Sequence, residues 1–526
     1  MILGDVFERN AQCYGGLPAI RFEGGTTTHR ELADRVCQLV DALARRGVGR
    51  GDRLAILSRN LPEYLEIYGA AGWGGFMGLG LNYRLSAPEQ LHILQDAAPA
   101  VLFYEAHYAQ RVAELRPHLP ADLLYVELRS SEREPLPPGA PADLTYETLL
   151  REGQATPPRE PARPDDTLFL IYTSGTTGKP KGAMLGNEAQ LEQARVQAMG
   201  HAAQPTDRML IVMPFYHIGG PTELLTFLCM GATIVLHREF DARAILHSIE
   251  AERVSAAHLA PTMIQMMLDE LEHRAYDLSS LHTICYASAP MSTALSKRAR
   301  AAFGPIFMQI YGMTENGLGT ALLKHQHIID GPPEAVKRLA SAGQPYLGTD
   351  IRIVRSDGER CAPHEPGEIL IRSASLMQGY WKQPEATANA LIDGWLHTGD
   401  IGYFDDEHYL FVVDRKKDMI VSGGENIYSR EVEEALVSHP AVLEAAVIGV
   451  PDATWGESVH AFVVRREGQA TDADALIQHC RSLIASYKKP RAVTFLPELP
   501  RVPSTRKVDK QALRKPFWSA QHRQVS

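Results

Sequence analysis

A run of eleven residues, 172–182, has the composition of a loop that binds a polyphosphate. It reads Tyr172-Thr-Ser-Gly-Thr-Thr-Gly-Lys-Pro-Lys-Gly182 and follows an apolar segment, 168–172, that we expect to form a strand. Its glycines let backbone N–H groups turn toward one anion, its hydroxyl side chains add donors, and its lysines add positive charge. It is not a P-loop, because only two residues separate Gly175 from Gly178 and Pro180 follows Lys179. A Ser/Thr/Gly surface loop is the structural alternative, and the lysines behind an apolar strand favour a phosphate loop.

Three further motifs follow at wide spacing: Tyr311-Gly-Met-Thr-Glu315, Thr398-Gly-Asp400, and Asp414-Arg-Lys-Lys-Asp418 with Ser422-Gly-Gly-Glu-Asn426 behind it. Taken alone, they are typical of a helix cap, a tight turn and a solvated charged turn. Together with the loop, their order and spacing resemble the adenylate-forming superfamily, which includes acyl- and aryl-CoA synthetases, adenylation domains of peptide synthetases and beetle luciferases. The resemblance extends over nearly the whole chain and is nearest to bacterial fatty-acyl and aryl-CoA ligases.

The resemblance implies an enzyme that activates a carboxylic acid in two steps. The acid attacks the α-phosphate of ATP, which gives acyl-AMP and pyrophosphate, and a thiol then displaces AMP. Because the first step brings two anions together, the site must supply positive charge and positioning. ATP, Mg²⁺ and CoA are therefore the expected cofactors, and a small fatty or aryl acid is the expected substrate.

The resemblance also implies roles for the residues that contact ATP. Glu315 would ligate Mg²⁺, since its carboxylate is a hard oxygen donor, and Thr314 would hydrogen-bond phosphate. Tyr311 would stack on adenine and Gln309 would reach the adenine edge. Asp400 would accept hydrogen bonds from both ribose hydroxyls, with Arg415 on the same sugar. The expected ATP and AMP ligands are Thr173, Ser174, Gly175, Thr176, Thr177, Gly178, Lys179, Lys181, Ala289, Gln309, Tyr311, Gly312, Thr314, Asp400 and Arg415.

Two more residues, besides Glu315, are expected to take part in catalysis, and a third is expected to act as a hinge. Lys507 is our choice for the lysine that bridges the acid and the α-phosphate, although the family's Gly-Lys is Arg506-Lys507 here, and Lys510 is the alternative. His217, in Met213-Pro-Phe-Tyr-His-Ile-Gly-Gly220, resembles a residue at the entrance between the acid and thiol tunnels. Lys417 falls at the family's hinge, which presents the C-terminal domain differently in each half-reaction.

CoA is expected to bind the C-terminal part of the chain. Gly423 and Gly424 would leave room for the pantetheine arm beside the backbone, because neither has a side chain. Trp455 would pack on that arm, and Lys489 and Arg491 would meet the nucleotide phosphates. Two alternatives remain: an acyl-AMP ligase that loads a carrier protein, and a catalytically inactive nucleotide- or acyl-binding regulator.

The sequence does not predict the length of the acid. Ser288 stands where the family commonly has glycine, which would shorten or polarise the pocket. Gly317 and Gly319, behind Glu315, would instead lengthen it.

The elements that position these residues alternate between helix and strand, which predicts α/β layers with much parallel sheet. Thr28 and Glu31 form a capping box for a helix, and Asp241, Ser429 and Thr471 with Asp474 are expected to begin others. Residues 131–164, with eight prolines, are expected to hold no core element. We expect a layered N-terminal domain, 1–416, with a β-rich subdomain, and a small mobile α+β domain, 417–526.

Composition sets the remaining limits. The 526 residues carry 53 basic and 63 acidic side chains, a net charge of −10 that argues against binding nucleic acid by neutralising phosphates. Six scattered cysteines form no C-x-x-C pair and are typical of the cytoplasm. No secretory signal is expected, and residues 209–236 are interpreted as a strand and a core helix rather than a membrane span. Assembly as a homodimer is left open.

Overall fold

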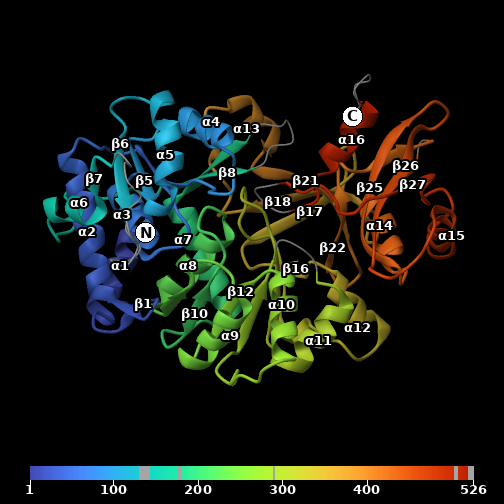
Figure 1. Cartoon of the computed structure of the whole chain (residues 1–526), viewed down its shortest axis with the longest axis horizontal. Helices are drawn as coiled ribbons and strands as arrows, with labels where there is room; N and C mark the ends of the chain where they lie inside the picture. The colour runs from blue at the N-terminus through green and yellow to red at the C-terminus, as the bar shows by residue number, and fades with distance from the viewer. Residues whose placement is uncertain (129–141, 174–179, 288–290, 424, 503–506, 519–526) are drawn as a thin grey trace. The chain divides into compact units, whose positions relative to one another are not determined.

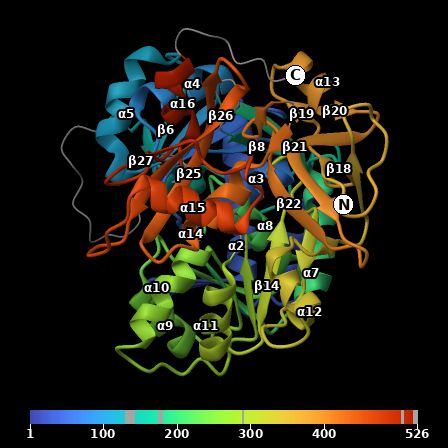
Figure 2. The same ribbon diagram turned by 90° about the vertical axis from the view of Figure 1, so that its right-hand side faces the viewer.

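The computed structural model describes residues 1–128, 142–173, 180–287, 291–423, 425–502 and 507–518. The chain divides into two compact units, shown in Figures 1 and 2. Unit 1 comprises Met1–Ile351 and Ile371–Leu396, and unit 2 comprises Arg352–Leu370 and His397–Ser526. The predicted mixed α/β class is confirmed. The domain boundary at 416/417 and the mobility of the C-terminal domain stay predictions.

The first sheet of unit 1 has nine strands in the order β16-β15-β14-β13-β12-β10-β11-β1-β2. Its central strands are parallel, and β2, β15 and β16 are antiparallel to their neighbours. The strands are β1 (Pro18–Phe22), β2 (Gly25–Thr28), β10 (Arg208–Ile211), β11 (Thr233–Leu236), β12 (Ala256–Leu259), β13 (Thr283–Tyr286), β14 (Phe307–Tyr311), β15 (Thr320–Leu322) and β16 (Gln344–Pro345).

The second sheet of unit 1 has eight strands in the order β19-β9-β8-β4-β3-β5-β6-β7. Strands β3 to β8 pair in parallel, and β8, β9 and β19 pair antiparallel at one edge. The strands are β3 (Arg53–Leu57), β4 (Met77–Gly80), β5 (Val101–Glu105), β6 (Leu124–Leu128), β7 (Leu144–Thr145), β8 (Thr167–Thr173), β9 (Lys181–Gly186) and β19 (Gly379–Tyr380).

Helices separate and cover these two sheets, as Figure 1 shows. Helices α9 to α11 share an apolar core with one face of the nine-stranded sheet, and α4 and α5 share one with a face of the eight-stranded sheet. Helices α1, α2, α3, α7 and α8 form a third core that reaches both sheets. Their bounds are α1 (Leu3–Cys13), α2 (His29–Arg45), α3 (Pro62–Gly74), α4 (Ala87–Ala97), α5 (Ala109–Leu115), α7 (Asn187–His201), α8 (Gly219–Met230), α9 (Ala242–Ala251), α10 (Pro261–Leu271) and α11 (Thr293–Phe303).

Local signals in the sequence explain several of these elements. Thr28 accepts the backbone N–H of Glu31, whose carboxylate returns to the Thr28 N–H, so the predicted capping box is confirmed. The side chain of Asp241 caps α9 as predicted. Glycines in α3 allow close packing: a Cβ on Gly69 would lie 2.8 Å from atoms of Phe7. The interpretation of residues 209–236 as strand and core helix is confirmed by β10 and α8.

The prediction that residues 131–164 hold no core element is wrong. Strand β7 and helix α6 (Tyr146–Glu152) lie there, and Tyr146, Leu149 and Leu150 are buried in the core of unit 1. Thr145 caps the helix by accepting the N–H of Thr148. The prolines on both sides of this helix made the whole segment resemble a loop. The helix is short and amphipathic, and it is stabilised by packing against α2 rather than by its own helix propensity.

Unit 2 contains a sheet in the order β24-β23-β26-β25, with β27 paired to β26. Helices α14 and α15 cover one face, as Figure 2 shows, and Leu513 of α16 packs with residues of the other face. The elements are β23 (Ile420–Ser422), β24 (Glu425–Ile427), α14 (Ser429–Val437), β25 (Val442–Asp452), β26 (Gly456–Arg465), α15 (Ala473–Leu483), β27 (Ala492–Phe495) and α16 (Lys510–Trp518).

Two predicted helix starts in unit 2 need correction. Ser429 is the first residue of α14 rather than its cap, because its N–H is bound by the carboxylate of Asp414, from a preceding strand. Helix α15 is capped by Asp472, which accepts the N–H of Ala475, rather than begun by the pair Thr471 and Asp474.

The remaining elements include one more sheet and several short helices. A further sheet has the order β17-β18-β21-β20, with β22 paired to β21. Within the described ranges, no helix combines the length and apolar character needed to cross a membrane. The elements are η1 (Ala106–Tyr108), η2 (Arg116–His118), η3 (Lys324–Gln326), α12 (Pro333–Lys337), η4 (Arg338–Ala340), β17 (Thr349–Val354), β18 (Gly367–Ser373), α13 (Pro384–Ala390), β20 (Leu391–Ile392), β21 (Trp395–Phe404) and β22 (Leu410–Arg415).

Candidate active site

The two strands that flank the proposed phosphate loop are paired antiparallel. In this register Thr173, the last residue of β8, lies opposite Lys181, the first residue of β9. The predicted strand before the loop is therefore confirmed, and both ends of the loop are held at one edge of the eight-stranded sheet. The loop residues Ser174, Gly175, Thr176, Thr177, Gly178 and Lys179 lie outside the described residues, and so does Ala289.

Tyr380 links the end of this loop to the expected metal ligand. Its hydroxyl donates a 2.8 Å hydrogen bond to Oε1 of Glu315, and Nζ of Lys181 lies 5.2 Å from the centre of its ring. Strand β19 positions Tyr380 by pairing it with Ala183 of β9. Burial and the Glu315 carboxylate raise the pKa of Tyr380, so its hydroxyl stays a donor. Lys181 and Glu315 therefore both lie beside Tyr380, a residue that belongs to none of the sequence motifs. Their roles at phosphate and metal stay predictions.

The turn after β14 fixes the direction of Glu315. Asn316 accepts the backbone N–H of Met313 through Oδ1 at 2.8 Å, and its own carbonyl accepts the hydroxyl proton of Ser375. The backbone carbonyl of Glu315 accepts the N–H of Met377 at 2.8 Å. Because one carboxylate oxygen of Glu315 is bound by Tyr380, the second offers the hard oxygen donor that Mg²⁺ prefers. These residues fit a phosphate-bound metal ion.

The other expected adenine and phosphate ligands lie around the same turn. Thr314 is buried, Tyr311 is half-buried and Gly312 is exposed. Gln309 is buried on β14 and accepts a hydrogen bond from the hydroxyl of Tyr286 at 3.2 Å. Their roles at adenine and phosphate stay predictions.

In unit 2 the structure brings together Asp400, Arg415 and Lys507. Asp400 on β21 pairs with Arg415 on β22, and their side chains form an ion pair at 3.3 Å between Oδ1 and Nε. The pKa of Lys507 is lowered by desolvation and by the charge of Arg415, whereas Asp400 acts in the opposite direction. The three charges therefore interact, which places the expected catalytic lysine beside the two expected ribose ligands.

Lys510 has different surroundings from Lys507. Its ammonium lies 2.7 Å from Oε1 of Glu433 and donates a 2.7 Å hydrogen bond to the hydroxyl of Ser429. Both partners belong to α14, so Lys510 joins α16 to that helix. This arrangement favours a structural role for Lys510.

The expected hinge residue lies just after β22. Lys417 follows Lys416, whose N–H is bound by the carbonyl of Gly399. Desolvation lowers the pKa of Lys417. Its role as a hinge stays a prediction.

Three of the five expected CoA residues lie together. Gly423 has a φ of +63°, and a Cβ there would lie 2.6 Å from the ring of Trp455. The guanidinium carbon of Arg491 lies 5.0 Å from the centre of the same ring. Lys489 instead donates to the carbonyl of Ser486 at 2.9 Å. Gly424 lies outside the described residues.

His217 lies in the segment between β10 and α8. Asn60 holds this segment by accepting the N–H of Phe215 and donating to the carbonyl of Met213, both at 3.1 Å. Nδ1 of His217 accepts the N–H of Gly219 at 3.3 Å. Burial and the charge of His217 lower the pKa of His258 to about 4, so the two rings are close neighbours.

The chain matches known proteins over nearly its full length. Residues 7–381 match the family described as AMP-binding enzyme, and residues 431–506 match the AMP-binding enzyme C-terminal domain. It is 38% identical to a feruloyl-CoA synthase from Amycolatopsis sp, over 95% of this chain and 96% of that protein. It is 34% identical to the fatty acid–[acyl-carrier-protein] ligase ScoC from Streptomyces coeruleorubidus, over 97% and 95%.

A solved structure extends the comparison to the fold. The o-succinylbenzoate CoA synthetase from Bacillus subtilis, in complex with its acyl-adenylate intermediate, superposes with a TM-score of 0.82 at 31% identity. The alignment covers 99% of this chain and 98% of that one. From the matched family models and these identities over almost the whole length, we conclude that the chain belongs to the AMP-binding enzyme family.

Proposed function

We propose that the protein is an ATP-dependent carboxylic acid–CoA ligase that works through an acyl-adenylate. The acid oxygen attacks the α-phosphorus of ATP and pyrophosphate leaves. The thiol of CoA then attacks the acyl carbon, the bond to AMP breaks, and the thiol proton is released. Mg²⁺, bound to the phosphates, would neutralise their charge during the first step.

The observation that carries this proposal is the contact of Tyr380 with Glu315 and Lys181. A cation at the end of a phosphate loop and a metal-binding carboxylate are the two groups that a departing pyrophosphate requires. Tyr380 lies beside both groups: Nζ of Lys181 is 5.2 Å from the centre of its ring, and its hydroxyl is 2.8 Å from Oε1 of Glu315. Asp400, Arg415 and Lys507 supply a second set of charges, suited to the ribose and the α-phosphate.

CoA is the acceptor that we favour. Trp455, stacked with Arg491, presents an aromatic face and a cation of the kind that a pantetheine arm and a nucleotide phosphate would contact. The second candidate is transfer to the phosphopantetheine of a carrier protein, which the similarity to ScoC supports. An inactive regulator is not favoured, because both relatives carry the names of a synthase and a ligase.

An aryl acid is the substrate class that we favour over a fatty acid. The feruloyl-CoA synthase and the o-succinylbenzoate CoA synthetase are both named for acids with an aromatic ring. Cytoplasmic localisation remains part of the proposal.

The test is acid-dependent release of pyrophosphate from ATP over linear, branched, alicyclic and aromatic acids, followed by thioester analysis with CoA. We expect pyrophosphate release to need the acid and Mg²⁺, and aromatic acids to give the highest kcat/KM. Thioester formed on a carrier protein and not on CoA would support the second candidate. Nucleotide binding without pyrophosphate release for any acid would contradict both.

A further inference from the structure

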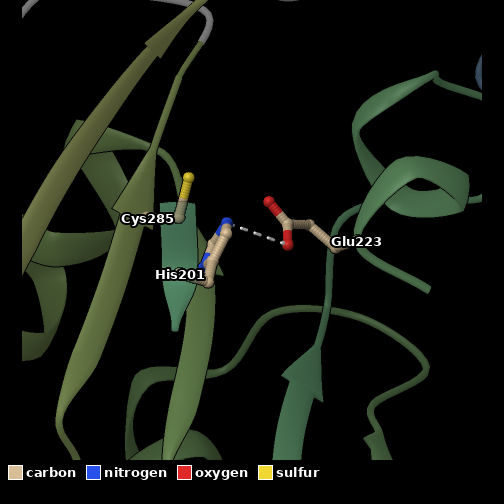
Figure 3. Close-up of side chains that lie close together, drawn as sticks. All are labelled: His201, Glu223 and Cys285. Carbon is tan, nitrogen blue, oxygen red and sulfur yellow. Dashed lines mark ion pairs between the residues drawn. The ribbon is translucent and has the colours of Figure 1, made fainter. Parts of the chain in front are cut away.

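A cluster of polar side chains is buried in unit 1 and has no part in the ATP chemistry. It contains His201 at the end of α7, Glu223 on α8 and Cys285 on β13, all turned toward one another in Figure 3. Each is at most 2% exposed, and Nε2 of His201 lies 3.6 Å from Oε2 of Glu223. His258 on β12 joins the cluster, with Nδ1 3.5 Å from Oε1 of Glu223.

The hydrogen bonds within the cluster are incomplete. The amide of Gln197 donates to Oε1 of Glu223 at 2.6 Å. Several buried polar atoms have no hydrogen-bond partner of normal geometry among the described residues: Oε2 of Glu223, Nδ1 of His201, Oε1 of Gln197 and both ring nitrogens of His258. The Glu223 carboxyl has only the weak thiol donor of Cys285 beside it, and His258 has the backbone of Gly219. Buried polar atoms are nearly always paired, because leaving one unpaired is costly. A group of them in one place therefore points to a polar ligand.

The cluster lies directly behind two segments of the candidate active site. A Cβ on Gly219 would lie 3.3 Å from Cε1 of His258 and 3.6 Å from Nδ1 of His217. On the other side, a Cβ on Gly317 would overlap the side chain of Gln193, which is one helical turn before Gln197 on α7. The segment that carries His217 thus contacts His258, and the turn that carries Glu315 contacts Gln193, one helical turn from the cluster residue Gln197.

The charge state of the cluster defines the ligand that it suits. Burial raises the pKa of Glu223 to about 8 and lowers the pKa values of His201 and His258 to about 3 and about 4. All three side chains are therefore neutral near pH 7. A neutral carboxyl and neutral imidazoles offer both donors and acceptors to a neutral partner, and nothing that favours an anion.

A metal ion is the other ligand that these residue types could hold, since the three ligating atoms lie within 4.8 Å of one another. The position of Gln197 argues against it. Its amide nitrogen lies 3.3 Å from Nε2 of His201 and also donates to Glu223. The lone pair that a metal would need thus faces an N–H group.

We propose that Glu223 and His258 form the far end of the acid-binding pocket and select acids with a neutral hydrogen-bonding group, such as a phenol hydroxyl, remote from the carboxylate. A hydroxyl both donates and accepts, so one such group can satisfy Oε2 of Glu223 and a ring nitrogen of His258 together. A plain alkyl or phenyl end would leave these atoms unpaired. This inference rests on the proposed acid activation.

Paired acids that differ by one hydroxyl test the inference: 4-hydroxycinnamate against cinnamate, and 8-hydroxyoctanoate against octanoate. We expect the wild-type protein to adenylate the better-fitting hydroxyl acid with a kcat/KM at least about 10-fold above its partner. Glu223→Leu and His258→Leu should bring that ratio near one by slowing the hydroxyl acid. The matched control is Thr226→Val, which removes a buried hydroxyl one turn along α8 that donates to the carbonyl of Thr222. It should leave the ratio unchanged.

Several results would overturn the inference. Equal kcat/KM for both members of each pair would do so, as would a ratio that Glu223→Leu and His258→Leu leave intact. If these variants fail to fold, Glu223→Met, which keeps the length of the side chain and removes both oxygen atoms, must lower the ratio. One equivalent of bound zinc, lost in Cys285→Ser, would assign the cluster to a metal.

Failure of the proposed function gives a different result from failure of this inference. If no acid releases pyrophosphate, the acid-activation proposal is wrong. The polar pocket is then tested separately, by measuring the binding of 4-hydroxycinnamate and cinnamate calorimetrically. Tighter binding of the hydroxyl acid, lost in Glu223→Met, would still support the polar pocket. Equal or undetectable binding of the two acids would contradict the polar pocket.

Discussion

The hydroxyl of Tyr380 donates a 2.8 Å hydrogen bond to the carboxylate of Glu315, which lies 65 residues earlier in the chain. The same ring lies against the ammonium of Lys181. Strand pairing between β19 and β9 creates this arrangement, so the sheet edge that carries the phosphate loop also orients the expected metal ligand.

We expect Tyr380→Phe to weaken the use of Mg²⁺ while leaving the fold intact. Phenylalanine keeps the ring beside Lys181 and removes only the hydrogen bond that orients Glu315. Loss of such a supporting contact typically costs about 10-fold in metal affinity or activity. The measurement is the Mg²⁺ dependence of acid-dependent pyrophosphate release. Tyr276→Phe, which breaks a comparable 3.2 Å contact with Glu270, is the control and should have no effect. An unchanged Mg²⁺ dependence in Tyr380→Phe would show that the contact is only structural.

Lys507→Ala and Lys510→Ala should fail in different ways. Lys507→Ala should slow adenylation by roughly two to three decades, since a lost transition-state contact costs about 3–4 kcal/mol, and should spare thioester formation from supplied acyl-AMP. Lys510→Ala should instead lower the stability of unit 2 by about 2–3 kcal/mol, because Glu433 loses its partner. Rates of both half-reactions and denaturant midpoints separate the two. Normal adenylation in Lys507→Ala, with adenylation lost in folded Lys510→Ala, would reverse our assignment.

Lys417→Pro should separate the two half-reactions. Proline fixes φ and restricts the preceding residue, so a hinge that must change its dihedral angles would be slowed. We expect adenylation to be largely retained and thioester formation to fall at least about 10-fold further, measured as pyrophosphate release and CoA-thioester formation in single turnovers. Lys417→Ala is the control, because it removes the side chain without fixing the backbone. Equal losses in both steps would indicate an ordinary structural position.

Lys489→Ala with Arg491→Ala should raise the KM for CoA and leave the KM for ATP unchanged. Their effect should shrink at high salt, because exposed ion pairs are screened over about 8–10 Å. Phosphopantetheine lacks the nucleotide, so its use should hardly change. Arg481→Ala, which removes an exposed cation of α15, is the control. Equal losses with CoA and phosphopantetheine would remove the assignment, and a wild-type protein that ignores CoA would favour the carrier-protein ligase.

Glu223→Gln should change how stability depends on pH. The raised pKa, about 8 against an ordinary 4.5, means that the folded protein holds a proton that the unfolded chain has released between these values. Wild-type stability therefore falls as pH rises from about 5 to about 8, by at most about 1.4 kcal/mol per pH unit from this group. The variant lacks this loss, so its stability relative to wild type should increase with pH. Denaturant midpoints at pH 5.5 and 8 measure the difference in stability between the two proteins. The contributions of other buried carboxyls, such as Glu63, are the same in both and cancel in this difference. Parallel pH profiles would contradict the buried, neutral carboxyl.

The sequence by itself determined the family, the α/β class and much of the local structure. The capping box of Thr28 and Glu31, the cap at Asp241 and the strand before residue 174 are all present, because such signals act within a few residues. Composition is a poor guide where tertiary packing stabilises an element. The many prolines around α6 predicted a loop there. Tyr146 of this helix is in fact buried in the same core as α2, and its hydroxyl donates a hydrogen bond to Glu66.

Only the tertiary structure decided which distant side chains meet. It brought Tyr380 to Glu315 and Lys181, and it placed Lys507 beside Arg415 while tying Lys510 to Glu433. It also collected His201, Glu223 and His258 into one buried cluster, although none belongs to a motif. Helical and strand periodicity assigns a residue to a face, but strand order and helix packing determine what lies opposite that face, and both depend on contacts far apart in the chain.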